Sequence, residues 1–587
     1  MKKTKLLFMR LLAAVMTGAL LLAACDPIEI ETVTAWDPID STVSRISGID
    51  ALSRPIEPQR EGEKKHDVGM FYFLWSGTAH SAGIFDIGKL QAENPASLYG
   101  PGDANSPAWQ MHYWGEPLFG YYNNLDPWVI ERHVEMLTFA GIDFLVLDTT
   151  NGPTYDAQLE VLFRALDKYR LDGFSVPKVT MLTHSGSIDV IKHFYKTIYR
   201  EGRYRELWYA PNGKPFIVGT KWGWREEDFA VRDFFDIREV QWPDSNIDLR
   251  NFPWIDFYYP LNNYEGTMVV SVAQHNSLQM SRESDGNRGR GYSFETFIND
   301  PDQSDAGLNY GFQWACVHQN RDALDTVFVT GWNEWSAAKH IDGEGKMYFV
   351  DSFNKTYSRD IEPMRGGHGD NFYMQTVSNI HRLNGQPQRS AVFAKHKLDA
   401  YADPDAWRDV RYEYRDFRGD ASVREHIDAS GKTVYRDASA RNDIVSVKAA
   451  HDDESLYFFV TTREAVTPYE AGDTSWMNIL LNVGNTASGF EGYDFILNYS
   501  PDPENGTTLV HRLTNGFSPE IAGSAALTVL GGSLFIRLSR ETVGLSAREP
   551  YFGFKVSDHI QNQADMAEYY VGGDSAPIGR LNYTYGR

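Results

Sequence analysis

The stretch that decides the fold reads Thr-Val-Phe-Val-Thr-Gly-Trp-Asn-Glu-Trp, residues 326–335. Its first half is a short run that is apolar on both faces, which is typical of a buried parallel strand. Its second half places Glu334 between two indoles and beside an amide. Acid/base chemistry on a sugar requires a carboxyl group in such a half-apolar, hydrogen-bonded setting. We therefore predict that Glu334 is catalytic, the alternative being an ordinary structural acid at a strand end.

Upstream of this stretch, short apolar runs alternate with amphipathic segments. The predicted strands are Val68–Leu74, Phe144–Leu147, Val179–Leu182, Phe216–Gly219, Glu239–Gln241, Ile255–Tyr259, Val269–Ala273 and Val327–Thr330. The predicted helices are Pro127–Ala140, Ala157–Tyr169, Ser187–Tyr199, Ala230–Phe235 and Leu308–Arg321. About eight strands separated by helices predict an α/β fold, a (β/α)₈ TIM barrel over residues 67–385. A doubly wound open sheet is the alternative, but no glycine-rich phosphate loop follows the first strand.

In such a barrel the residues at the carboxyl ends of the strands face the active site. Aromatic, amide and acidic groups predominate at these positions, a set that suits a neutral, polyhydroxylated ligand. The predicted substrate-binding residues are Trp75, Asn151, His184, Trp222, Trp242, Tyr258, His275, Asn333 and Trp335.

Two further acids are candidates for catalysis beside Glu334. Asp148 ends a predicted strand, where the alternative is a carboxylate that braces the loop. Glu116 lies in a long aromatic loop after the first strand, and loops of that length often line sites. We predict catalytic or substrate-contacting roles for both.

The N-terminus predicts secretion and lipid attachment. Basic residues precede an apolar run that ends Leu21-Leu22-Ala23-Ala24-Cys25, which describes a signal peptide over residues 1–24. The ending resembles the lipobox of bacterial lipoproteins, and this resemblance implies lipidation of Cys25 and anchoring in the bacterial cell envelope, at the outer membrane or cell surface. The alternative is a simple secretory signal. Residues 25–66 lack sustained periodicity and are predicted to form a tether between the lipid and the folded body.

The charge and residue composition of the chain argue against some classes of binding partner. The chain has 587 residues and a net charge of −23 at pH 7, which argues against nucleic acid because phosphate binding needs clustered cations. Contact with a membrane is expected through the lipid anchor only. The acidic and histidine residues between His340 and Asp370 show no zinc or EF-hand spacing, so no metal site and no cofactor are predicted, although an oxygen-ligated Ca²⁺ stays open.

Three segments carry a resemblance to a known family. Leu125–Asp148, Asn212–Phe216 and Gly331–Trp335 resemble the second unit, the "NGKP" strand entry and the terminal "WNEW" of glycoside hydrolase family 71/99-like barrels. The resemblance implies a (β/α)₈ fold and cleavage of α-linked glycans. In family 99 the Glu of Asn-Glu-Trp, here Glu334, assists attack by the sugar's own 2-hydroxyl. The family's acid/base three residues later is replaced by Ala337.

Residues 394–587 change character. Short alternating runs separated by Gly, Asn, Asp and Pro predict an antiparallel β-sandwich. The segments Asp452–Phe458, Gly492–Phe495 and Gly573–Asp574 resemble carbohydrate-binding module family 9-like domains. Trp476, Phe490 and Tyr493 are candidates for a sugar platform, and burial in the sandwich core is the alternative.

Three classes of function fit these patterns. The favoured class is a lipid-anchored glycoside hydrolase that acts on an oligo- or polysaccharide by carboxylate acid/base catalysis. The second is a non-catalytic glycan-binding surface lipoprotein, motivated by Ala337. The third is a polysaccharide lyase, which would need cations converging on uronates that the strand ends mostly lack.

Overall fold

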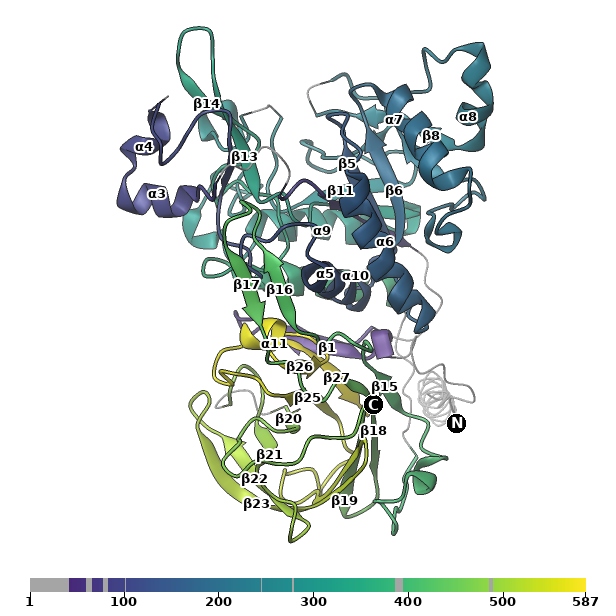
Figure 1. Ribbon diagram of the computed structural model, residues 1–587, viewed down its shortest axis with the longest axis vertical. Helices are drawn as coiled ribbons and strands as arrows, with labels where there is room; N and C mark the ends of the chain where they lie inside the picture. The colour runs from purple at the N-terminus through teal and green to yellow at the C-terminus, as the bar shows by residue number, and fades with distance from the viewer. Residues whose placement is uncertain are drawn as a thin grey trace, which may run out of the picture.

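The computed structural model describes residues 42–59, 66–77, 83–100, 102–243, 245–276, 279–385, 394–484 and 489–586. The predicted signal peptide and Cys25 lie outside these residues, as does the segment 386–393 between the two predicted domains. Among the described helices, none is both long enough and apolar enough to cross a membrane. In Figure 1 an upper α/β part stands on a lower, antiparallel β part.

The upper part is built on a seven-stranded parallel sheet with the spatial order β11-β12-β3-β5-β6-β7-β8. Its strands are β3 (Asp67–Tyr72), β5 (Phe144–Thr149), β6 (Lys178–Thr183), β7 (Phe216–Val218), β8 (Asp236–Arg238), β11 (Thr267–Ser271) and β12 (Thr326–Thr330). A second parallel pair is formed by β9 (Val240–Gln241) and β10 (Phe252–Pro253). The apolar runs recognised in the sequence thus become parallel strands because they are buried on both faces.

Aromatic side chains show that this sheet is strongly curled. Phe252 on β10 lies 5.7 Å from the ring of Phe216 on β7 and 5.0 Å from that of Phe328 on β12. Phe328 in turn lies 6.0 Å from Phe71 on β3. One apolar cluster on the concave face therefore contacts strands from both ends of the sheet.

One glycine is required by this packing. A Cβ added to Gly69 on β3 would lie 2.3 Å from the ring of Phe144 on the neighbouring strand. Only a residue without a side chain leaves room for that ring.

Helices lie around the parallel sheet, except α3 (Ile87–Glu93) and α4 (Ala96–Tyr99), which lie apart from it in Figure 1. The described α-helices of this part are α3 (Ile87–Glu93), α4 (Ala96–Tyr99), α5 (Pro127–Phe139), α6 (Asp156–Leu171), α7 (Ser187–Phe194), α8 (Phe229–Phe234), α9 (Leu308–Asn320) and α10 (Asn371–Asn384). Helix α5 begins as predicted, because Asp126 caps it by accepting a bond from the Trp128 N–H at 3.1 Å and Pro127 occupies the first turn. Helices α3, α4 and α10 were not predicted.

The predicted strand Ile255–Tyr259 is wrong. The strand at this point is β10, a few residues earlier, and Ile255–Tyr259 lies in a loop. The Asp256 carboxylate accepts backbone bonds from Tyr258 (3.0 Å) and Asn262 (2.8 Å), which holds a turn instead of an extended strand.

A small antiparallel sheet projects beside the parallel one. It has the order β14-β13-β4 and consists of β4 (Met111–Tyr113), β13 (Ser336–Ile341) and β14 (Met347–Val350). Strand β13 starts directly after Trp335, so residues 326–335 lead from the parallel sheet into the β13–β14 hairpin (Figure 1).

The lower part is one continuous antiparallel sheet with the order β15-β18-β19-β24-β23-β22-β21-β20-β25-β27-β1-β2, with β26 paired to β25. Phe458 on β19 lies 5.6 Å from Phe554 on β25, although these strands are not neighbours, so the sheet folds over on itself around a core. Its strands are β15 (Glu413–Arg415), β18 (Ile444–His451), β19 (Ser455–Thr462), β20 (Asn478–Asn482), β21 (Phe495–Asp502), β22 (Thr507–Leu513), β23 (Pro519–Leu530), β24 (Ser533–Ser539), β25 (Phe552–Asp558), β26 (Asp574–Ala576), β27 (Leu581–Tyr585), β1 (Ile46–Ile49) and β2 (Pro55–Ile56).

The prediction of a tether over residues 25–66 is wrong for residues 46–56. This segment forms β1 and β2, and β1 pairs with β27 near the other end of the chain. The alternation of buried and half-buried residues in β1 spans only four residues, which is too short to predict a strand from the sequence. The strand is stabilised by its pairing with β27.

The two parts share a buried interface. Eleven of the thirteen residues of α5 are buried, because this helix and α10 lie between the parallel sheet and the antiparallel one (Figure 1). Across the interface Arg424 pairs with Asp126 at 2.8 Å, and Arg580 pairs with Asp370 at 2.9 Å. Arg424 belongs to a hairpin, β16 (Arg424–Ile427) and β17 (Val434–Asp437), that rises from the lower part onto the upper one; the short α11 (Glu568–Val571) lies near its base.

Candidate active site

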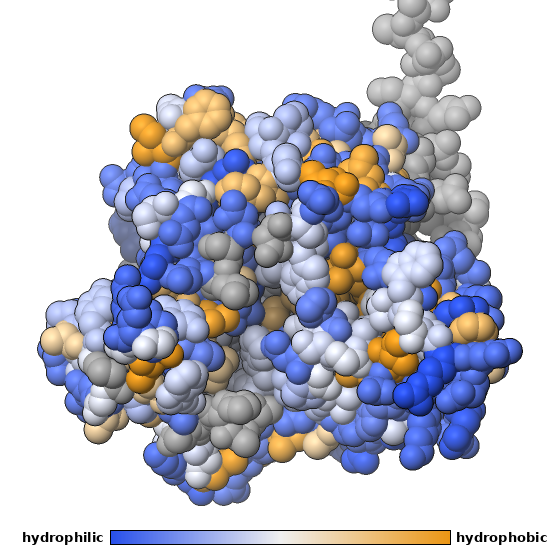
Figure 2. Space-filling view, turned by 90° about the horizontal axis from the view of Figure 1, so that it is seen from above, coloured by the Kyte–Doolittle hydropathy of each residue, from blue (hydrophilic) through white to orange (hydrophobic). Residues whose placement is uncertain are grey.

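A cleft of about 480 Å³ opens at the carboxyl ends of the parallel strands. Figure 2 looks onto this end of the molecule, whose surface is mainly hydrophilic with scattered hydrophobic residues. The cleft is lined by Phe71, Phe73, Trp75, Asp148, Thr150, Asn151, His184, Ser185, Trp242, Pro243, Trp254, His275, Asn276, Met280, Glu334, Val350 and Asp351.

The β13–β14 hairpin brings two acids to the cleft. Glu334 lies two residues before β13 and Asp351 lies directly after β14. The antiparallel register pairs Ala338 with Val350, so Glu334 and Asp351 lie at the same end of the hairpin. Asp351 also has a left-handed backbone conformation (φ 69°), which is uncommon for a residue with a side chain and is often found at functional sites.

Glu334 is held by a buried guanidinium. Its carboxylate forms an ion pair with Arg359, and both side chains are almost fully buried. Arg359 also contacts the His275 ring nitrogen Nε2 and lies 4.9 Å from the centre of the Trp254 ring. The backbone N–H of Glu334 donates to Asp360 at 2.5 Å. These contacts fix both the backbone and the side chain of Glu334.

Asp148 and Asp351 form a second acidic group in the cleft. Burial raises the pKa of Asp148, although a bond from Thr150 and the charge of Arg359 act against this. Burial and the negative charge of Asp148 raise the pKa of Asp351 to about 7. Two carboxyl groups that disfavour each other's ionisation can hold a proton near neutral pH, which a general acid needs.

Several polar atoms in the walls of the cleft are buried and have no hydrogen-bond partner among the described residues. The indole N–H groups of Trp75, Trp242 and Trp254 have no hydrogen-bond partner within the described part of the chain, and neither has Nδ1 of His275. His184 packs edge-on against Trp242 with ring centres 4.9 Å apart. Aromatic side chains that line a cleft beside acids and amides suit a ligand that carries many hydroxyl groups.

The structure brings together seven of the residues singled out from the sequence. They are Trp75, Asp148, Asn151, His184, Trp242, His275 and Glu334. The other five lie elsewhere. They are Glu116, Trp222, Tyr258, Asn333 and Trp335.

The side chains of Asn333 and Trp335 do not line the cleft, and both are bonded to other parts of the protein. The Asn333 side chain bonds the backbone N–H and C=O of Phe73 at 2.9 and 3.1 Å, which ties β12 to β3. Trp335 stacks on Trp114 at 4.4 Å and donates its indole N–H to Glu362. Both support the backbone on either side of Glu334, so their predicted role as substrate contacts is corrected to a positioning role.

Glu116, Trp222 and Tyr258 are corrected for a different reason. Glu116 pairs with Lys89 at 2.7 Å and lies outside the cleft, so this loop acid has a structural partner instead of a catalytic position. Trp222 is 76% exposed and Tyr258 is 52% exposed, and neither lines the cleft. A position at or after a predicted strand is therefore not sufficient to place a side chain in the cleft, since these three side chains do not line it.

Ala337 lies in a small apolar cluster. It is fully buried with Ile87, Leu98 and Phe349, on the side of β13 that packs against α3 and α4. The position at which the resemblance implies an acid/base therefore does not line the cleft in this chain.

Sequence reasoning missed Arg359, Trp254 and Asp351. Arg359 and Asp351 lie in a segment without periodicity, where charged residues are normally solvated. The signal that could have found Asp351 is the hairpin pattern after Trp335, since Gly343 and Gly345 mark a turn that returns the chain to its starting point.

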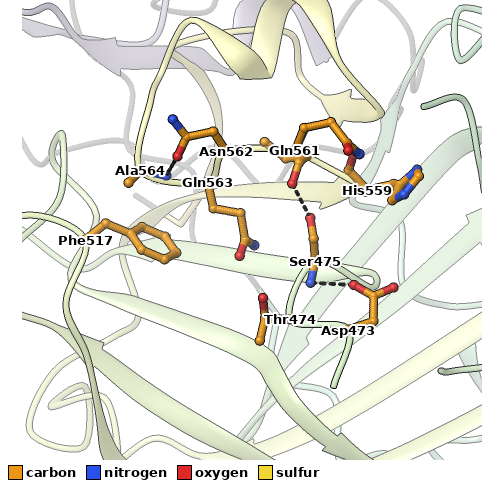
Figure 3. A pocket seen from close by; sticks show the side chains of 10 residues that line it. Asp473, Thr474, Ser475, Phe517, His559, Gln561, Asn562, Gln563 and Ala564 are labelled. Atoms are coloured by element: carbon orange, nitrogen blue, oxygen red, sulfur yellow. Dashed lines mark hydrogen bonds between the residues drawn. The ribbon is translucent and has the colours of Figure 1, made fainter. Parts of the chain in front are cut away.

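A second cavity, of about 340 Å³, lies in the antiparallel part. Figure 3 shows Asp473, Ser475, Phe517, His559 and the amides that follow it around this cavity. Several of its polar groups are used internally, for example Ser475, which donates to the Ile560 carbonyl at 2.9 Å.

The candidate sugar platform Trp476, Phe490 and Tyr493 is buried. Trp476 and Tyr493 are each 1% exposed, and Phe490 is 5% exposed. The alternative role in the core of the antiparallel part is therefore the correct one for these three side chains.

No protein-family model matches the sequence, and no curated protein matches it. Among solved structures, the chain is similar to a GH99 endo-alpha-mannosidase from Bacteroides thetaiotaomicron. One structure of that enzyme, in complex with Bis-Tris-propane, shows 13% identity and a TM-score of 0.32. A second shows 11% identity and a TM-score of 0.30. Each similarity covers 54% of this chain and 97% of the other.

A third similar structure, described as a glycoside hydrolase, shows 11% identity over 80% of this chain and 98% of the other, with a TM-score of 0.18. With TM-scores this low, the similarities do not by themselves establish the fold or the activity of this chain.

Proposed function

We propose that this protein is a glycoside hydrolase that cleaves an oligo- or polysaccharide by carboxyl acid/base chemistry. The observation that carries the proposal is the convergence of Glu334, Asp148 and Asp351 on one aromatic-walled cleft at the carboxyl ends of parallel strands. Glycosidic bonds are cleaved by such carboxyl pairs, one as an acid and the other as a base or nucleophile.

The proposal includes a (β/α)₈ barrel as the scaffold. The eight strands would be β3, β5, β6, β7, the β8–β9 segment, β10, β11 and β12, with β10 and β11 closing the ring. The support for closure is the apolar cluster in which Phe252 on β10 contacts both Phe216 and Phe328. Active sites of such barrels lie at the carboxyl ends of the strands, where this cleft is.

The carboxyl groups are assigned different roles. Asp351, whose pKa is raised to about 7, would protonate the departing glycosidic oxygen. Glu334, ionised beside Arg359, would act at the sugar ring, as base or as partner of the attacking hydroxyl. Asp148 maintains the proton on Asp351 by its nearby charge. In this scheme Asp351 replaces the acid that the family resemblance would place at Ala337.

The substrate class and location rest on the sequence. The resemblance of the Gly331–Trp335 and Asn212–Phe216 motifs to family 71/99-like barrels supports an α-linked glycan. The sequence ending at Cys25 supports a lipid anchor in the bacterial cell envelope, at the outer membrane or cell surface, with the oligo- or polysaccharide substrate as the partner.

A glycan-binding protein without turnover is the second candidate. One argument for it is Ala337, because the position of the family's acid has no carboxyl group in this chain. The other is that the Glu334 carboxylate already forms an ion pair with Arg359. Such a protein would use the same cleft and the same aromatic walls.

A panel of glycans assayed for new reducing ends, with wild type and Glu334→Gln, separates the candidates. The hydrolase predicts turnover that falls ~10²–10⁴-fold in the variant, with glycan affinity retained. The binder predicts no turnover in either protein and similar affinity. Because Glu334→Gln leaves Arg359 without its partner, the melting temperature of both proteins is measured, and activity is compared per folded molecule. Undiminished turnover in a folded variant would refute the assignment.

A further inference from the structure

Five acidic side chains meet where the two parts of the molecule join. Glu135 comes from helix α5 of the upper part, and the other four come from the lower part. Asp416 and Asp420 follow β15, Asp443 precedes β18, and Asp574 begins β26. This interface cluster lies far from the cleft, at the opposite end of the parallel sheet, and the proposed hydrolysis does not use it.

The oxygen atoms of the cluster are close enough to share an ion. One ligand atom each from Glu135, Asp416 and Asp420 lie within 4.8 Å of one another, and the same holds for Asp420, Asp443 and Asp574. Oxygen ligands of Ca²⁺ lie about 2.3–2.6 Å from the metal, so oxygens on opposite sides are about 5 Å apart. A small cavity of about 10 Å³, room for one water-sized sphere, lies beside the cluster. Glu135, Asp420 and Asp574 line it together with Arg132, whereas Asp416 does not.

The first of these triads has unused oxygen atoms. Asp416 is fully buried, and neither of its carboxylate oxygens has a hydrogen-bond partner in the described part of the chain. Glu135 is 1% exposed, and its Oε1 is also without a partner there. Buried carboxylate oxygens without partners cost several kcal/mol unless a proton or a cation satisfies them.

Asp443 and Asp574 differ from Asp416 and Glu135. Asp443 accepts the Gly419 N–H on both oxygens, at 3.0 and 2.9 Å, and Asp574 accepts the Ile444 N–H at 2.6 Å. They are therefore satisfied in part by the backbone, as is Asp420 of the triad, which accepts the Ala421 N–H at 2.9 Å.

The nearby cations do not pair with the triad. Lys555 is buried, but its ammonium donates to the Ser575 hydroxyl at 3.2 Å and to the Pro577 carbonyl. Arg132 donates to the Tyr570 carbonyl at 3.2 Å and lies over the Trp128 ring. Among the described residues, no ion pair within 4 Å joins either cation to a triad carboxylate. Their charges nevertheless act to lower the pKa of the triad acids, Arg132 on Glu135 and Asp420, and Lys555 on Glu135 and Asp416.

We propose that Glu135, Asp416 and Asp420 bind a divalent cation, Ca²⁺, that joins the two parts of the molecule. An all-oxygen, carboxylate-rich set is the chemistry that Ca²⁺ prefers, whereas zinc sites use histidine and cysteine. Because Glu135 belongs to α5 and the two aspartates to the antiparallel part, the ion would bind the folded interface and stabilise it by mass action.

The test removes metals from the full-length protein with a chelator, adds Ca²⁺ back, and then measures calcium content and melting temperature. After desalting of the Ca²⁺-loaded protein we expect about one Ca²⁺ per chain to be retained, and we expect the melting temperature to rise with Ca²⁺ concentration at constant ionic strength. Asp416→Asn should weaken Ca²⁺ binding at least about tenfold and abolish the shift, because one charged ligand is lost. If that variant does not fold, Glu135→Gln tests the same site from the helix.

Asp370→Asn is the matched control. Asp370 is a buried carboxylate at the same interface, but it pairs with Arg580 and lies outside the cluster. This variant should melt at a lower temperature and keep the full response to Ca²⁺. Wild type that binds no stoichiometric Ca²⁺ would overturn the proposal. So would an equal shift with Mg²⁺, or an Asp416→Asn variant that is more stable with and without Ca²⁺, since a shared proton would then satisfy the acids.

Discussion

Replacing Asp351 with Asn tests whether this residue is the proton donor. An ordinary aspartate has a pKa near 3.8, so at pH 7 fewer than about 1 in 1,000 molecules would carry the proton. With a pKa of about 7, roughly half of the molecules carry it. Asn cannot donate that proton, so turnover of a natural glycan should fall ~10²–10⁴-fold.

The leaving group distinguishes a lost acid from a damaged site. A glycoside with a nitrophenol leaving group departs without protonation, so Asp351→Asn should lose less than about tenfold on such a substrate. Glu344→Gln is the matched control, because Glu344 is exposed on the turn of the same hairpin. Its turnover should equal wild type on both substrates.

The pH profile gives an independent readout. Because the protonated form of Asp351 is the active one, turnover should be present below pH 7 and decline as pH rises through about 7. This decline in turnover with rising pH reports the titration of the coupled pair Asp148 and Asp351 together. Asp148→Asn removes the negative charge that, together with burial, raises the pKa of Asp351. Residual activity in that variant should therefore decline at lower pH. Equal losses on both glycosides, or an unchanged alkaline limb in Asp351→Asn, would refute the assignment.

Three further predictions concern packing, binding and modularity. Gly69→Ala should lower the free energy of unfolding by about 1–3 kcal/mol in denaturant titrations, because the new methyl meets an aromatic ring, whereas Gly343→Ala, in open space, should be near neutral. Trp242→Ala should weaken glycan affinity about 5–10-fold by calorimetry, and the exposed Trp222→Ala should leave it unchanged. A fragment of the α/β part without the antiparallel part should aggregate, because α5 would expose its buried face, and a soluble fragment with a cooperative melt would contradict this.

The candidate cleft shows which features can be recognised locally. Asp148, His184 and Trp242 were found because each follows a strand whose apolar run is visible in the chain, and parallel strands end at one edge. Asp351 reaches the same edge through a hairpin whose register depends on pairing between β13 and β14. That Asp351 is an aspartate in a polar segment did not predict its place in the cleft, because acids in such segments are normally solvated.

What the sequence determines by itself is the alternation of buried strands and capped helices, the antiparallel character of the C-terminal part and the acid between two indoles. These depend on periodicity and capping within a few residues. Only the tertiary structure decides that Arg359 pairs with Glu334, that β1 completes a sheet formed by the other end of the chain, and that Glu135 meets Asp416. Those contacts join residues far apart in the chain, and their energies depend on burial and charge that exist only after the parts have packed together.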